Sequence, residues 1–344
     1  MILPATYVGT LIVMILGMLC VGLWANAYKM AGKLRFELFY VDFAIGVGLA
    51  AVIYGLTFGN LGFDGFSLMD DLMQVHKHQW LDAFGAGVIF NMANMLLVGA
   101  ISVAGMAVAF PVALGFALIA GVLLSQLSQR TANPLYLWVG CALVLAAILA
   151  DAVAYNSLVA RRRASATATG KKKTSGPRAI KGLILSVIGG LLMGVLYPLL
   201  RAAREGDVGL GPYSLMVLFA AGAFLSTFVF SLFFMNLPVE GEPLEVREYF
   251  TMRANRHLFG LAGGILWSTG ALATFVAEGT APEARLGRAT ELALSYGGPM
   301  IAALCGLLVW KEFEEGGGRP KAMAFATVIL FAGGLASFWL AFRG

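Results

Sequence analysis

Charged residues are scarce in this sequence. Only 12% of the 344 residues are Asp, Glu, Lys or Arg, whereas 59% are hydrophobic. Because a soluble domain carries about twice that charge, at about 25%, the composition excludes an ordinary soluble protein. It predicts a helical protein that crosses a membrane many times.

Cysteine and histidine are also rare. The three cysteines lie in three different apolar runs, which excludes a disulfide framework and predicts ordinary packing. They are Cys20, Cys141 and Cys305. The three histidines are His76, His78 and His257. His76 and His78 share a predicted surface loop without a third metal ligand, so we expect neither a metal nor a cofactor.

Ten apolar runs have the length of about 17 to 25 residues that a membrane-spanning helix needs. The first follows Met1 almost directly, without a basic segment or a cleavage site, so we expect a membrane span there and not a removed signal. The ten predicted spans are 4–28, 38–58, 81–101, 104–127, 135–158, 179–201, 213–236, 256–278, 285–309 and 321–341.

A basic segment divides these spans into two sets of five. Residues 159–178 are rich in Arg, Lys, Ser and Thr and lack apolar periodicity, so we expect a linker between repeats at 1–158 and 179–344. Of the 24 Lys and Arg residues, one alternating set of loops holds 17 and the other holds 7. The positive-inside rule therefore predicts a cytoplasmic linker and both termini outside. We expect a multi-pass protein of the inner (plasma) membrane.

Five spans in each half imply that the halves insert in opposite senses, so a relation between them would be an inverted repeat. Short matches support this relation. The segment from Gly87 to Asn94 matches the segment from Gly264 to Ala271, and Gly22-Leu-Trp24 matches the segment that begins at Gly194. IAGVLLSQ, from Ile119, also aligns with IAALCGLLVWKE in the ninth span. We therefore predict an all-α fold of ten transmembrane helices arranged as a 5+5 inverted repeat.

Several segments resemble the drug/metabolite transporter superfamily, in particular its branch of ureide permeases and sugar-uptake carriers (rhamnose–proton symporter-like). They are GLWANAYKMAGKLRFELFYVDFAIG, HQWLDAFGAGVIFNMANML, LMGVLYPLL, FGLAGGILW and GGPMIAALCGLLVWKEF. The resemblance implies ten helices, alternating access and proton-coupled import. The sequence departs from the family at Gly270, at Phe110-Pro111 and at Lys311-Glu312, where the family has Gly-Glu.

Glu291 lies about two turns inside the ninth span, next to the helix-breaking run Gly297-Gly298-Pro299. An acid inside a membrane is a functional candidate by default, and an interrupted helix beside it is typical of a transporter's binding site. We expect Glu291 to carry the coupled proton. The alternative is a side chain that reaches the outer interface beside Arg285 and Arg288.

Two other acids lie within predicted spans. Asp42 lies about one turn inside the second span, close to the loop that carries Lys33 and Arg35. It is a second proton relay or a gate partner, or else a capping or charge-paired residue at a helix start. Asp151 lies toward the inner end of the fifth span, where we expect an ion pair with Arg161–Arg163.

A flat heterocycle or a sugar needs aromatic faces to stack on and polar groups that read its edge. Candidates for substrate binding occur at comparable depth on several spans. They are Trp24, Asn91, Asn94, Tyr197, Trp267, Ser268, Thr290 and Tyr296. Pro111, Pro198 and Pro299 lie within spans and are candidate hinges, although tolerated kinks explain them equally well.

These features predict a secondary active transporter, not an enzyme. The expected cargo is a small neutral polar molecule such as a ureide or nucleobase, moved with protons by a monomer or homodimer without nucleic acid. Sugar uptake and drug or amino-acid export are the alternatives within the superfamily. An intramembrane protease is the alternative of another class, because Glu314, Glu315 and Arg319 match EExxxR. That family also needs a later His, which this sequence lacks.

Overall fold

The structure is a computed structural model that describes residues 1–128, 132–168, 176–206 and 208–343. The described residues form helices and connecting loops without a strand, and ten helical segments are long and apolar enough to cross a membrane. They confirm the all-α membrane fold. The spans are α1 (Tyr7–Met30), α2 (Phe36–Leu56), α4 (Lys77–Ala104), α5 (Met106–Ser128), α6 (Pro134–Ala168), α7 with α8 (Gly176–Gly194, Leu196–Ala202), α9 (Pro212–Asn236), α11 (Ala254–Glu278), α12 with η1 (Arg288–Leu304, Cys305–Val309) and α13 (Gly318–Phe342).

Two spans are interrupted. The sixth is broken between α7 and α8 at Val195, and the ninth passes from α12 into the π-helical turn η1. Short helices that the apolar pattern does not predict lie in the loops: α3 (Leu68–Gln74), α10 (Arg247–Phe250) and the 3₁₀ turn η2 (Glu314–Gly316). The helix α6 continues to Ala168, so the first part of the predicted linker is helical, and residues 169–175 lie outside the described part.

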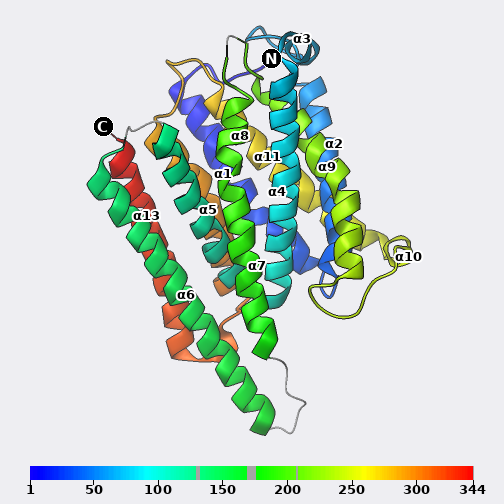
Figure 1. Cartoon of the computed structure of the whole chain (residues 1–344), viewed down its shortest axis with the longest axis vertical. Helices are drawn as coiled ribbons and strands as arrows, with labels where there is room; N and C mark the ends of the chain where they lie inside the picture. The colour runs from blue at the N-terminus through cyan, green and yellow to red at the C-terminus, as the bar shows by residue number, and fades with distance from the viewer. Residues whose placement is uncertain (129–131, 169–175, 207, 344) are drawn as a thin grey trace.

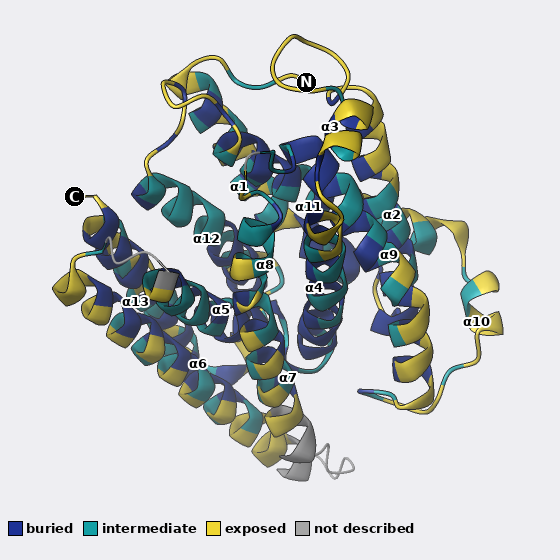
Figure 2. Ribbon diagram, turned by 45° about the horizontal axis from the view of Figure 1, so that its top comes forward, coloured by how far each residue is buried: buried dark blue, intermediate teal, exposed yellow. Residues whose placement is uncertain are grey.

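The outer faces of the bundle are apolar. On α6, for example, Leu135, Trp138, Leu145, Leu149 and Val153 are all exposed. Figure 2 shows exposed residues along the outward sides of α6, α9 and α13, whereas buried residues face the neighbouring helices. A soluble protein rarely exposes such continuous apolar surface. These faces therefore suit contact with lipid and make the chain a multi-pass membrane protein.

Each span of the first half has an equivalent five spans later in the second half. Equivalent spans make equivalent contacts. The first span packs on the eighth as the sixth packs on the third, and the eighth packs on the second as the third packs on the seventh. The sixth likewise packs on the fourth as the first packs on the ninth. Figure 1 shows the fifth and tenth spans, α6 and α13, side by side, and both chain termini at one end of the bundle. Because successive spans alternate in direction, equivalent spans run in opposite senses.

Glycines make the closest of these equivalent contacts. A Cβ atom added to Gly87 on α4 would lie 1.9 Å from the carbonyl oxygen of Phe219 on α9. A Cβ atom on Gly264 of α11 would lie 2.0 Å from the carbonyl oxygen of Phe43 on α2. Gly87 and Gly264 are the first residues of the matched segments in the sequence. The match therefore reflects two equivalent sites where only glycine lets the helices approach so closely.

A second pair of glycines supports the same relation. A Cβ atom on Gly22 would meet Ile301 and the carbonyl oxygen of Gly298, and one on Gly194 would meet Ala120 and the carbonyl oxygen of Ala117. These contacts equate Ile301 with Ala120, whereas the sequence match equates it with Ile119. The alignment of the fourth and ninth spans is thus wrong by one residue. Such a shift is difficult to detect in sequence because neighbouring residues in both runs are similar, small and apolar.

The first prediction concerns these contacts. We expect Gly87→Ala to destabilise the protein by about 1–3 kcal/mol, because the backbone must shift to admit the methyl group. Gly85→Ala is the matched control on the same helix, where the added methyl group meets nothing within 4 Å. It should be neutral or slightly stabilising, by about 0.5–1 kcal/mol. Thermal melting of both variants in detergent distinguishes the two effects, and equal melting temperatures would contradict the close packing.

Candidate functional site

A cavity of about 620 Å³ opens at the end of the bundle where the two termini lie. We call it the main cavity. It lies between the ends of α5, α8 and α11 and the beginning of α12, so both halves of the chain form it. The residues with polar side chains in its lining are Ser125, Tyr197, Arg201, Arg204, Glu205, Glu278, Arg285, Arg288, Glu291, Ser295 and Tyr296.

The interrupted sixth span shapes one wall of the main cavity. The helix α7 ends at Gly194, where a Cβ atom would lie 2.5 Å from the Cβ of Ala120 on α5. After the turn at Val195, α8 carries Tyr197 and Arg201 to the cavity. Gly194 and Leu196, on the two sides of this turn, belong to the cavity lining, as expected of distorted backbone at membrane depth.

Two ion pairs lie at the mouth of the cavity. Arg201 pairs with Glu205 four residues later, and Arg204 pairs with Glu278 at the end of α11. Arg204 also donates from Nε to the carbonyl oxygen of Leu200. Each pair is partly exposed, so its charges remain in contact with solvent at the entrance. The pair between Arg204 and Glu278 joins the sixth span to the eighth.

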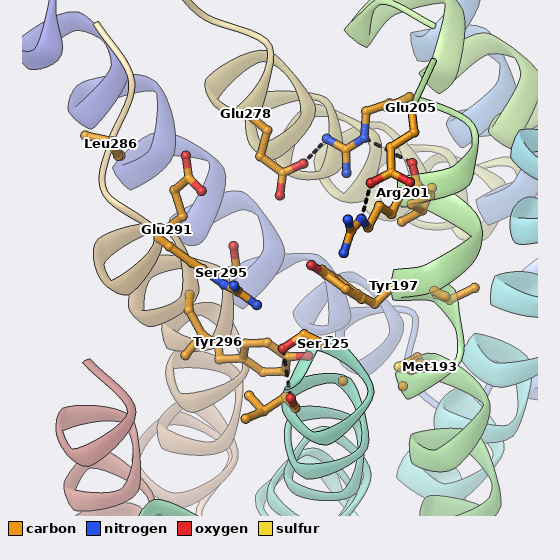
Figure 3. Close-up of a pocket in the computed structure, with 18 of the residues that line it drawn as sticks. Ser125, Met193, Tyr197, Arg201, Glu205, Glu278, Leu286, Glu291, Ser295 and Tyr296 are labelled. Atoms are coloured by element: carbon orange, nitrogen blue, oxygen red, sulfur yellow. Dashed lines mark hydrogen bonds and ion pairs between the residues drawn. The ribbon is translucent and has the colours of Figure 1, made fainter. Parts of the chain in front are cut away.

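Glu291 lies in the wall of the main cavity, on the first turn of α12 (Figure 3). Its side chain is partly buried, and its Oε1 atom is buried without a hydrogen-bond partner among the described residues. Arg285 and Arg288 line the same cavity. The structure thus has features of both alternatives for Glu291. The acid lies in the wall of a cavity, as expected of a proton-carrying group, and it shares that cavity with the two arginines.

Two of the eight predicted substrate residues, Tyr197 and Tyr296, line the main cavity with Glu291. Figure 3 shows the two rings on opposite walls, with Tyr296 beside Ser125. A Cβ atom on Gly121 would lie 3.5 Å from the Tyr296 hydroxyl oxygen, so this ring lies across α5. Thr290 precedes Glu291 but is not part of the lining.

The other five predicted substrate residues lie in packed protein outside this cavity. Asn91 donates to Ser226 Oγ at 2.7 Å and accepts from Thr227, and Asn94 donates to the hydroxyl of Tyr40 at 3.2 Å. Their polar groups are thus used between helices. The remaining three are Trp24, Trp267 and Ser268.

These three residues belong to the aromatic core and its border. Trp24 is 1% exposed and lies 5.0 Å from the ring of Phe43, centroid to centroid. Trp267 stacks on Phe90 at 4.1 Å, and the Ser268 hydroxyl donates to the carbonyl of Val47. These three residues are candidates because they lie at similar depth on equivalent helices. Their side chains nevertheless face neighbouring helices and not the cavity.

Asp42 is buried at the opposite end of the bundle from the main cavity. Its carboxylate accepts from the Tyr249 hydroxyl at 2.6 Å and lies 2.9 Å from His257 Nδ1. Burial and the neighbouring carboxylate raise the pKa of Tyr249. Arg35, an expected partner of Asp42, pairs with Glu37 instead. Asp42 therefore holds the loop before α11 against α2.

Asp151 is fully buried on α6, and neither carboxylate oxygen has a partner among the described residues. The expected ion pair with Arg161–Arg163 is therefore wrong. Ten residues of straight helix separate Asp151 from Arg161, about 15 Å along the axis, so those arginines lie too far toward solvent. Arg162 pairs with Glu315 at 2.9 Å instead.

A group of contacts, which we call the Glu312 cluster, joins the two halves at the end opposite the main cavity. Glu312 follows the ninth span and accepts from the backbone N–H groups of Met106 and Ala107 at 3.0 and 2.8 Å. Lys29 Nζ, at the end of α1, lies 2.5 Å from the same carboxylate. A carboxylate at a helix N-terminus is favoured by the unpaired N–H groups there. Nearby, Trp310 donates to Asn26 Oδ1 at 2.7 Å, again from the second half to the first.

The backbone around Glu312 is shaped for this contact. Gly105, the single residue between α4 and α5, has φ of +92°, and a Cβ atom there would lie 2.6 Å from the carboxylate. Lys311 has φ of +50°, a conformation that favours glycine. Both residues turn the chain so that Glu312 reaches the start of α5.

The main cavity and the Glu312 cluster lie at different levels of α1. Gly22 meets Gly298 of α12, close to the cavity-lining Tyr296, and Lys29 reaches Glu312. Trp24 lies between these two levels and also packs against Phe110 of α5. A layer of buried aromatic side chains therefore separates the cavity from the far end.

The three candidate hinge prolines occupy different positions. Pro111 lies inside α5 and Pro299 inside α12, whereas Pro198 is the third residue of α8, directly after the break at Val195. Two of the three thus accompany an interrupted span. Whether they act as hinges stays a prediction.

Several residues of the site had no signal strong enough to be chosen from the sequence. Arg201, Arg204, Glu205 and Glu278 lie at predicted span ends, where charged residues are ordinary. Only the fold shows that they surround one cavity. Ser125 and Ser295 are small polar residues in apolar runs, where such residues are common at helix contacts.

No family model and no curated protein matches this chain. A solved structure described as "Crystal structure of protein" superposes on it with a TM-score of 0.53. The alignment covers 96% of each chain at 18% sequence identity. This likeness concerns the fold alone, and it shows that the arrangement of these helices occurs in another protein.

The second prediction tests the strained backbone beside Glu312. A residue with a Cβ atom in the left-handed region costs about 1–2 kcal/mol relative to glycine. Both Lys311→Gly and Lys311→Ala remove the lysine and its 4.0 Å contact with Glu314. We expect the glycine variant to be more stable than the alanine variant by about 1 kcal/mol, measured as a higher melting temperature in detergent. An alanine variant at least as stable as the glycine variant would show that the strain is absent.

Proposed function

We propose that this protein is a secondary active transporter that imports a small polar metabolite together with protons. The observation that carries the proposal is the position of Glu291. Its carboxylate lies in a cavity formed by both halves, beside the interrupted sixth and ninth spans. Many secondary transporters bind their cargo between their two repeats, beside broken helices.

The difference between the two ends of the bundle supports alternating access. One end holds the main cavity. At the other end a smaller hollow of about 430 Å³ is lined by Lys29 and Glu312 of the Glu312 cluster, and the aromatic layer around Trp24 separates the two spaces. Transport needs a second state in which the far end opens and the cavity closes. In this proposal Glu312 acts as the gate, because one carboxylate joins α1 and α5 of the first half to the end of the ninth span.

Glu291 is suited to carry the proton. An acid in a partly buried site without a full set of hydrogen bonds is stabilised by protonation more than an exposed one is. The main cavity gives it access to water from one side only. Opening of the opposite end would let the same carboxyl release its proton there.

The dimensions and lining of the cavity fit a small polar cargo. Ligand pockets commonly measure about 300–1,000 Å³, and this cavity of about 620 Å³ falls within that range. Tyr197 and Tyr296 offer rings on opposite walls, and Ser125 and Ser295 offer hydroxyl groups. A ureide or nucleobase fits this lining, as does a sugar. The resemblance to ureide permeases and sugar-uptake carriers supports the same choice.

The third prediction tests proton coupling. In proteoliposomes, uptake of at least one member of a panel of allantoin, uracil, rhamnose and glucose should rise with an imposed pH gradient. We expect Glu291→Gln to abolish this stimulation, a loss of about tenfold or more, because glutamine cannot bind and release a proton. Glu283→Gln, an exposed residue of the preceding loop outside the cavity lining, is the control.

Two results would contradict this proposal. Uptake that does not respond to the pH gradient would show that transport is not coupled to protons. A Glu291→Gln variant that keeps the full response would show that another group carries the proton. In the Glu283→Gln control the pH gradient must still stimulate uptake. Loss of stimulation in both variants would indicate a general effect of the substitution on insertion or folding.

The fourth prediction tests the gate. Glu312→Gln removes the charge that Lys29 contacts, and it should expose residues behind the cluster more often. Ala109, on α5, is fully buried one turn beyond Met106. We expect a cysteine at Ala109, in a background without the native cysteines, to react with a polar maleimide about tenfold faster when Glu312 is Gln.

Glu314→Gln provides the matched control for the gate, because Glu314 lies two residues away and its nearest basic groups are 4.0 Å distant in exposed contacts. It should leave the labelling rate unchanged. Equal rates in the Glu312 and Glu314 variants would assign Glu312 a purely local role.

A further inference from the structure

The charges that line the main cavity do not cancel. Four arginines and three glutamates belong to the lining among the described residues. The arginines are Arg201, Arg204, Arg285 and Arg288, and the glutamates are Glu205, Glu278 and Glu291. With all groups ionised the lining has an excess of one positive charge, and protonation of Glu291 adds a second. A cavity of this sign attracts anions.

One of these arginines has an unused hydrogen-bond donor. Arg201 donates from Nε to Glu205, which holds one edge of its guanidinium group. Its Nη1 atom is buried and has no hydrogen-bond partner among the described residues. A buried donor atom without an acceptor costs free energy, so a ligand that accepts from this Nη1 atom gains binding energy, although the rest of the side chain is partly exposed.

The surroundings of Arg201 suit a carboxylate in particular. Tyr197, one turn earlier on α8, lies beside the guanidinium group in the cavity, and its hydroxyl is a further donor (Figure 3). Arg204, by contrast, is occupied by Glu278 and by the carbonyl of Leu200. The planar fork of arginine matches the two oxygens of a carboxylate.

We propose that the cargo carries a carboxylate group that binds Arg201, while Glu291 on the facing wall binds the proton. This inference rests on the proposed function and replaces the neutral cargo expected from the sequence with an organic anion of the same size. Transport of one such anion with one proton moves no net charge. Transport of a neutral cargo with one proton would move one positive charge and would respond to a membrane potential.

The experiment compares pairs of probes that differ by a carboxylate. They are allantoin with allantoate, uracil with orotate, and glucose with glucuronate. Binding to the purified full chain is measured by calorimetry, and uptake is measured in proteoliposomes with an imposed pH gradient or an imposed potential. We expect at least one carboxylate to bind tenfold or more tightly than its neutral partner. Its uptake should follow the pH gradient and ignore the potential.

Variants of Arg201 test the residue itself. Arg201→Gln should weaken binding of that carboxylate at least tenfold, and Arg201→Lys should weaken it less because it keeps the charge without the fork. Arg343→Gln is the control, since Arg343 lies over the ring of Trp339 and outside the cavity lining. The lysine variant also separates lost binding from lost folding, because its melting temperature should stay near that of the unmodified protein.

The outcomes distinguish this inference from the proposed function. Preference for a neutral probe, with uptake that still depends on the pH gradient and on Glu291, would overturn the anionic cargo and leave proton-coupled transport intact. Carboxylate binding that is unchanged in Arg201→Gln would overturn the role of Arg201. Failure of every carboxylate to bind would also overturn the inference, and the absence of gradient-driven uptake for all six probes would count against the transporter proposal itself.

Discussion

A charged group inside an apolar bundle must find partners or water, and this constraint determines how the two ends of the molecule differ. At one end, Glu312 satisfies its carboxylate with Lys29 and the first N–H groups of α5. This one side chain therefore joins the halves there. At the other end, Glu291 has no such set of partners and lies in a cavity. One end thus holds a carboxylate that joins the two halves beside a hollow of about 430 Å³, and the other holds an unsatisfied carboxylate in the larger cavity of about 620 Å³.

The two halves are nearly equivalent in packing but not in charge. Gly87 and Gly264 make the same close contact in the two halves, and Gly22 and Gly194 make another. These contacts require glycine at only a few positions, so the rest of each half can differ in sequence and in charge. In our proposal the two repeats exchange between a state open at one end and a state open at the other. In our proposal the charged residues at the ends decide which state is favoured, and proton and cargo binding shift that balance.

The sequence predicted the fold well because membrane spans depend on length and composition, which are local properties. It also singled out Glu291, which lines the main cavity, since an acid next to Gly297-Gly298-Pro299 is conspicuous in an apolar run. It could not show that Asn91 and Trp267 face neighbouring helices, because the direction of a side chain depends on how helices pack. It likewise missed Arg201 and Glu278. Charged residues at span ends are ordinary in sequence, and only the fold brings these two to the same cavity.

The central claim is that the carboxyl group of Glu291 exchanges its proton with water through the main cavity. Infrared difference spectroscopy of the protein in lipid, across a series of pH values, measures the carbonyl band of a protonated carboxylic acid directly. We predict a band that is present at acidic pH, is lost as the pH rises, and is missing from the same series with Glu291→Gln. Identical difference spectra for the two proteins would contradict the account.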